Sequence, residues 1–140
     1  MLENLASYFE PTHEFYLNSI SYERNKEGIL QDVKDLVCVE NVGVTLKDDT
    51  LTVILQRTLK FNPSNIIELT VSFGADLIFL KSKKGEVDWE KLNLAEEFRD
   101  NGDFVLANLA ARISLLIGEI TASFGQVPLM TPPQQFNKLN

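Results

Sequence analysis

The chain has 140 residues, the size of one domain, and 44% of them are hydrophobic while 24% are charged. Acidic residues outnumber basic ones by 20 to 13, which gives a formal net charge of −7 and a pI near 4.7. This balance argues against nucleic-acid binding, because phosphates require clustered Lys and Arg, and it favours basic partners or basic unfolded segments.

The single cysteine, Cys38, lies in an apolar run, so no intrachain disulfide is possible. The first residues, MLENLASYFEP, have neither the basic start nor the long apolar stretch of a secretory signal. We therefore expect a cytoplasmic protein with one domain over residues 1–140.

The N-terminal part predicts a loose leader over residues 1–12, a strand over 13–24 and a crossover segment over 29–35. Simple alternation in the strand puts two sets of side chains on opposite faces: Tyr16, Ile20 and Tyr22 on one, Phe15 and Leu17 on the other.

Three more strands are predicted over residues 36–46, 50–61 and 66–80. The first two are joined by a hairpin loop at Lys47-Asp48-Asp49, and Gly74-Ala75 in the third indicates a bulge or bend. Alternation with one polar face is typical of an antiparallel sheet with one solvated side.

Two helices follow, a short one over Trp89–Asp100 and a long one over residues 104–124. Asp103 is placed to cap the first turn of the long helix, and Gly125 to end it. We expect an α+β fold, a four-stranded antiparallel sheet with the long C-terminal helix and the short preceding helix on one face.

The long helix carries a stripe of large apolar residues and, beside it, a stripe of small residues. Such a helix is covered on more than one side, so it is either sandwiched inside the fold or part of a subunit interface. We do not expect it to span a membrane, because Arg112 and Glu119 would each cost about 2.5–3.5 kcal/mol near the bilayer centre. Instead we predict a homo-oligomer packed along it, with close approach through the small residues Ala107, Ala111, Ser114 and Gly118.

Residues 126–140 predict an extended strap, because three prolines in VPLMTPP exclude a helix. Its apolar and aromatic side chains, with those of the leader and the first strand, offer adaptable contact surface. The alternative is that these side chains close the core of the domain itself.

Few residues suggest catalysis or cofactor binding. His13 is the only histidine and is expected at the surface or an edge, and Cys38 reads as a buried structural thiol. No zinc pattern and no Gly-rich phosphate loop is present. We expect no metal, no cofactor and no enzyme, although a reaction that needs only two carboxylates stays open.

The segments ANLAARIS and VPLMTPPQQF resemble the C-terminal half of the SecB export-chaperone family. The matching positions are Phe104, Val105, Leu106, Ala111-Arg112, Ile113-Ser114, Val127-Pro128-Leu129, Pro132-Pro133 and Phe136. The chain departs from the family where Gln134-Gln135 replaces Val-Asn, and where the Arg-Gly that follows the helix is missing.

The resemblance implies an ATP-independent holdase that assembles as a dimer of dimers and binds unfolded polypeptides, with protein export as one candidate role. It points to the crossover and the strap as the client-binding parts: Ile29, Leu30, Val33, Leu129, Met130 and Phe136. The family also presents acids on its sheet to the SecA motor, and Glu23 and Glu68 carry over here as partner-binding residues.

Three alternatives stay open. The chain could be a dedicated chaperone of one client such as an antitoxin, a small ligand-binding or enzymatic α+β domain, or a structural oligomer without a client. A holdase should suppress aggregation of an unfolded protein at stoichiometric amounts, whereas an enzymatic or ligand-binding domain and a structural oligomer should not.

Overall fold

The computed structural model describes residues 2–24, 35–62, 67–123 and 128–135. Several predicted residues fall outside this set, so their roles stay predictions: Ile29, Leu30, Val33, Gly125 and Phe136.

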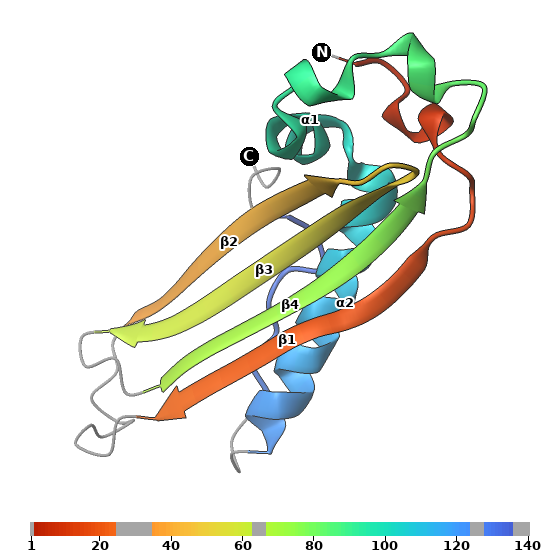
Figure 1. Cartoon of the computed structure of the whole chain (residues 1–140). Helices are drawn as coiled ribbons and strands as arrows, with labels where there is room; N and C mark the ends of the chain where they lie inside the picture. Colours follow the sequence, from red (N-terminus) through yellow and green to blue (C-terminus); the bar gives the residue numbers. More distant parts are fainter. Residues whose placement is uncertain (1, 25–34, 63–66, 124–127, 136–140) are drawn as a thin grey trace.

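A four-stranded antiparallel sheet forms one layer of the fold (Figure 1). Its strands are β1 (Glu14–Arg24), β2 (Asp35–Leu46), β3 (Thr50–Asn62) and β4 (Ile67–Ile78), in the order β1-β4-β3-β2. The hairpin between β2 and β3 is tight, since the Lys47 N–H donates to the Thr50 carbonyl at 2.9 Å. The expected α+β fold class is confirmed.

The two faces of the sheet differ in the way the alternation predicts. On β3, Leu51, Val53 and Leu55 point inward and are fully buried, whereas Thr52 and Gln56 on the opposite face are half-buried. On the outer face, polar side chains bond across strands, as in the Thr58–Thr70 hydroxyl pair at 3.0 Å and the Thr52–Asp76 bond at 2.8 Å. The same face also carries the exposed apolar residues Val37, Val39 and Ile78.

A bulge in β1 overturns the predicted faces of that strand. Leu17 lies opposite Phe73 and Ser19 opposite Ser72, so Asn18 is an extra residue. An extra residue reverses the alternation that follows it. Ile20 and Tyr22 therefore share the inner face with Phe15 and Leu17, and of these five apolar and aromatic residues only Tyr16 points outward. Gly74 is no bulge, because the β3–β4 register continues unbroken through it. The glycine instead makes room for the Tyr16 ring, which a Cβ there would meet at 2.6 Å.

Helices cover the inner face of the sheet: α1 (Leu94–Asn101) and α2 (Asp103–Ala122). The expected helix from Trp89 is wrong at its start, because Trp89–Lys91 is a single 3-10 turn. The Asn93 side chain instead caps α1 by accepting the Glu96 N–H at 3.3 Å. Asp103 does not cap α2 but begins it, and its carboxylate accepts from Gln135 at 3.3 Å.

The leader is not loose, and this part of the prediction is wrong. It forms the 3-10 helix Leu5–Tyr8, and both Leu5 and Phe9 are buried in the core. The Phe9 ring lies 4.8 Å from Phe79 and 5.9 Å from Trp89, beyond the end of the sheet. Aromatic area at this end therefore holds the N-terminus in place.

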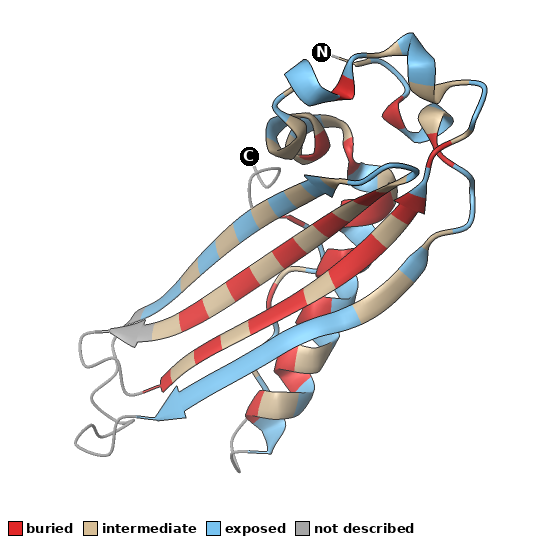
Figure 2. Ribbon diagram, in the orientation of Figure 1, coloured by how far each residue is buried: buried red, intermediate tan, exposed pale blue. Residues whose placement is uncertain are grey.

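The helix α2 is long and apolar enough to cross a membrane by length and composition alone, but half of it is buried inside the molecule. Figure 2 shows its buried side facing the sheet. The buried positions belong to both predicted stripes, since Leu109 and Ile113 face the sheet while Ser114 and Gly118 are also covered. Its apolar character is therefore explained by packing within the chain.

Candidate functional site

The described part of the strap, residues 128–135, runs beside α2 and β3 without regular secondary structure and bends at Pro133-Gln134. Figure 1 shows it as the violet trace on the helix side of the sheet. Its Thr131 and Gln135 side chains are buried, whereas Met130 remains 74% exposed. The strap is therefore part of the folded domain and also contributes to its surface.

Arg57 anchors the strap from β3. It sits between Leu55 and Leu59 on the inner face and is fully buried. Its guanidinium donates to Thr131 Oγ1 at 2.7 Å and to two strap carbonyls, Pro132 at 2.8 Å and Gln134 at 3.0 Å. Sequence reasoning missed this residue, although the period of two in β3 places position 57 inward.

Glu40 supplies the opposite charge for Arg57. The two residues face each other across the β2–β3 ladder, and Nη2 and Oε2 are 2.7 Å apart with side-chain exposures of 0% and 4%. A second bond from Nε to the same oxygen, at 3.1 Å, fixes the guanidinium plane. A buried charge is tolerated when it is paired and hydrogen-bonded in this way.

Cys38 lies two residues before Glu40 on the same face of β2 and is half-buried. Burial raises the pKa of its thiol to about 11, Glu40 adds to the rise, and Arg57 opposes it. The thiol is therefore protonated near neutral pH, which agrees with the predicted structural role rather than with a nucleophile.

The α2 side of the strap is lined by small and hydroxyl residues. Ser114 donates to the Thr131 carbonyl, and Thr121 Oγ1 accepts the Leu129 N–H at 2.8 Å. Gly118 faces Met130, whose Sδ would be 3.3 Å from a Cβ at position 118. The close approach expected at Ser114 and Gly118 is thus made by the strap of the same chain.

The other two residues of the predicted oligomer interface, Ala107 and Ala111, are exposed on α2. They are open to contact, and an interface through them stays a prediction.

An almost wholly apolar groove of about 240 Å3 lies between the strap and the C-terminal half of α2. It is lined by Leu115, Gly118, Glu119, Ala122, Pro128 and Met130. Leu115 is 63% exposed and forms the ridge opposite Met130. Of the strap residues predicted to bind clients, Met130 is available in this groove, while Leu129 is half-buried against the core.

A second hollow, of about 220 Å3, lies on the other side of Leu115. Phe73, Arg112, Leu115, Leu116 and Glu119 line it. Phe73 connects the hollow to β1, because Leu17 is its partner across the ladder.

Exposed apolar side chains continue from this hollow along the inner face of β1. Leu17, Ile20 and Tyr22 are 48%, 45% and 42% exposed, and Figure 2 shows the C-terminal half of β1 in the colour of exposed residues. The two hollows together with the exposed side chains Leu17, Ile20, Tyr22, Leu115 and Met130 are called the apolar surface below. It crosses three elements that are far apart in the sequence.

The two predicted partner-binding acids meet on the outer face. Glu23 and Glu68 are directly opposite each other in the β1–β4 ladder. Glu68 also lies 3.8 Å from Lys60, and both of these side chains are 45% exposed. The structure therefore brings together two residues that were predicted separately, on the face away from the apolar surface.

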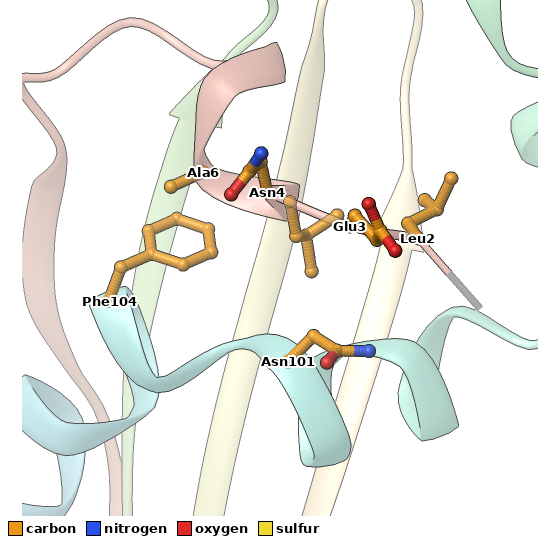
Figure 3. A pocket seen from close by; sticks show the side chains of 7 residues that line it. Leu2, Glu3, Asn4, Ala6, Asn101 and Phe104 are labelled. Carbon is orange, nitrogen blue, oxygen red and sulfur yellow. The ribbon is translucent and has the colours of Figure 1, made fainter.

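A larger hollow, of about 640 Å3, lies at the N-terminal end of the chain (Figure 3). The leader forms one wall, and Asn101 and Phe104 form the other. Asn101 Nδ2 is buried and has no hydrogen-bond partner among the described residues. The hollow is open and has no cluster of titratable groups, so we assign no chemistry to it.

Groups that could carry catalysis or bind a metal are sparse. No three His, Cys, Asp or Glu side chains within the described ranges are close enough to hold a metal ion. The His13 ring is half-buried and lies edge-on to Phe15 and Phe104, at 6.0 and 5.7 Å.

Comparison with known proteins gives a match by structure and none by sequence. No family model and no curated protein matches the sequence. The fold matches the Mycobacterium tuberculosis Rv1957 SecB-like chaperone, solved in complex with a ChAD peptide from the Rv1956 HigA1 antitoxin. The TM-score is 0.70 at 13% identity, over 94% of this chain and 91% of that one.

A protein of unknown function from Streptococcus agalactiae also matches, with a TM-score of 0.45 at 11% identity, over 86% of this chain and 95% of that chain. The match to the Mycobacterium tuberculosis chaperone, over 94% of this chain, supports the resemblance found in the strap and long helix: this chain has the fold of a SecB-like chaperone.

Proposed function

We propose that this protein is a chaperone that holds extended, apolar segments of unfolded polypeptide on its apolar surface. One observation carries the proposal: two hollows that share Leu115 and Glu119 join α2 to the exposed Met130 of the strap and to Phe73, whose strand partner Leu17 begins a row of exposed apolar side chains on β1. Large contiguous apolar patches on an otherwise polar protein mark sites of interaction. The peptide held by the Mycobacterium tuberculosis SecB-like chaperone supports a polypeptide as the ligand.

Binding in this proposal needs neither ATP nor a cofactor. Apolar contact supplies about 25 cal/mol per Å2 as an upper guide, and the net charge of −7 attracts basic segments over longer distances. We place this activity in the cytoplasm, where a chain with one free cysteine is kept reduced.

Two clients or partners fit the proposal at a finer level. The antitoxin peptide bound by the structural neighbour favours a chaperone dedicated to one client. The facing acids Glu23 and Glu68 favour a motor of the SecA type, as in protein export, because they offer a basic partner two carboxylates on a flat face.

We further propose a homo-oligomer, a dimer of dimers as in the SecB family. Ala107 and Ala111 are exposed one turn apart in the N-terminal half of α2, where small side chains allow close helix packing. The groove beside Met130 lies at the C-terminal half of α2 and would stay open in such an assembly.

The test is suppression of aggregation of a denatured model protein by stoichiometric chaperone. Met130→Ser should weaken capture severalfold, because it removes the most exposed apolar side chain of the groove. Ile78→Ser is the matched control, since Ile78 is also exposed, at 43%, but lies on the outer face. Equal loss in both variants, or in neither, would contradict the proposed site.

The competing enzymatic role is tested in the same assay. His13→Ala and Cys38→Ala should capture the client as wild type does, because neither residue has a chemical role here. Loss of activity in these variants, with Met130→Ser still active, would favour a chemical site.

A further inference from the structure

The strap is bound largely through its backbone, as a receptor can bind a peptide. Along six residues, four of its backbone groups are bound by side chains of β3 and α2. They are the Leu129 N–H and the carbonyls of Thr131, Pro132 and Gln134. The side chains that bind them are Thr121, Ser114 and Arg57.

These contacts depend little on the sequence of the strap. A backbone N–H or carbonyl is the same in almost every residue, and Arg57 binds the carbonyls of Pro132 and Gln134, where the strap bends at Pro133-Gln134. Thr131 Oγ1 adds one side-chain contact to Arg57, and Gln135 adds others to the Arg99 carbonyl and to Asp103.

The residues that bind the strap, Arg57, Ser114 and Thr121, are called the receptor side. The positive charge of Arg57 is neutralised without the strap. Glu40 pairs with Arg57 from β2, and this ion pair lies wholly within the sheet. Arg57 would therefore keep its orientation and its paired charge if another chain replaced the strap.

We propose that the channel between α2 and β3 is a backbone-binding site for extended polypeptide, and that the strap is the occupant that a client displaces. The inference rests on the proposed chaperone function and adds a site to it. The apolar groove attracts the client through side chains, and Arg57, Ser114 and Thr121 then bind its backbone without reading its sequence.

Occupancy of the channel by the strap also lowers the apparent affinity of the protein for a client. The apparent Kd of a client equals the intrinsic Kd divided by the fraction of molecules whose channel is open. A change that weakens the strap without touching the receptor side should therefore tighten client binding, whereas a purely structural strap would give unchanged or weaker binding.

Thr131→Val is the test variant. It removes the hydroxyl that accepts from Arg57 and nearly preserves the shape of the side chain. Hydrogen exchange should show a loosened strap, and a reduced, carboxymethylated model protein that stays unfolded should bind about two- to tenfold more tightly than to wild type. Thr45→Val, an exposed position on the outer face, is the matched control and should change neither quantity.

A peptide of the strap sequence, PLMTPPQQ, gives a second readout. It should bind Thr131→Val and compete with the unfolded protein there. Wild type should bind it weakly, because its own strap is present at a high effective concentration. If the single change does not loosen the strap, Thr131→Val/Gln135→Ala also removes the Gln135 contacts to the Arg99 carbonyl and to Asp103, and it leaves Arg57, Ser114 and Thr121 unchanged.

A loosened strap with client binding unchanged or weaker than in wild type would overturn the inference. Absence of binding to wild type and variants alike would instead contradict the chaperone proposal itself, so the two failures are distinguishable.

Discussion

At the scale of single residues, Arg57 and Glu40 show what burial does to charge. The pair is buried from solvent. It links β2 to β3, and Arg57 also donates hydrogen bonds to the strap. Removing one partner of a buried pair typically costs about 3–5 kcal/mol, because the other charge stays buried, whereas exposed pairs are worth about 0–1 kcal/mol.

We therefore expect Glu40→Ala to lower the free energy of unfolding by about 3–5 kcal/mol. The control is Glu68→Ala, which breaks the exposed Lys60–Glu68 pair and should change it by less than about 1 kcal/mol. Urea unfolding of both variants measures this. Similar losses in the two would show that the Arg57–Glu40 pair is not buried as described.

Cys38 gives a prediction that depends on pH. Its thiol pKa is raised to about 11 in the folded protein, from an ordinary value of 9.0, so the folded state favours the protonated form. Stability from this group is complete below pH 9 and is lost as the pH rises through 11. Alkylation at pH 8 should be on the order of a hundredfold slower in the folded chain than in urea, since the thiolate reacts. Equal rates would contradict the burial of Cys38.

At the scale of elements, regular patterns were predictable and their exceptions were not. The alternation in β3 identified its buried leucines. It also places Arg57 on the buried face, but burial of an Arg is rare and is not predicted from the alternation alone. The bulge at Asn18 has no glycine or proline to mark it, so the faces of β1 came out wrong after Leu17.

The small-residue stripe of α2 shows a different limit. Small residues indicate that another backbone comes close, but they do not say whether it belongs to the same chain. Ser114 and Gly118 meet the chain's own strap, while Ala107 and Ala111 remain exposed.

Two substitutions separate these halves of the stripe. Gly118→Leu should push the strap away, because even a Cβ there lies 3.3 Å from Met130 Sδ, and should cost about 1–3 kcal/mol. Ala111→Leu should leave the strap in place and disrupt a helix-mediated oligomer. Light scattering and proteolysis of the strap measure the two effects. A wild-type monomer at micromolar concentration would contradict the proposed assembly.

At the scale of the whole molecule, the sheet exposes two different surfaces. The outer face carries hydroxyl pairs and the acids Glu23 and Glu68, with scattered exposed apolar residues such as Val39 and Ile78. The inner face is covered by α2 over β3 and β4 and by the strap beside them, which leaves the inner face of β1 and the groove at Met130 exposed. The proposed function assigns the client to the inner side of the sheet and a charged partner to the outer side.

The most direct test of this account is to map where an unfolded client touches the protein. A photo-crosslinking amino acid is placed in turn at Met130, Ile20 and Ile78, and a denatured model protein is added during its refolding. The account predicts client adducts at Met130 and Ile20, which lie on the apolar surface, and few at Ile78 on the outer face. Adducts mainly at Ile78, or none at Met130 and Ile20 while aggregation is still suppressed, would contradict it.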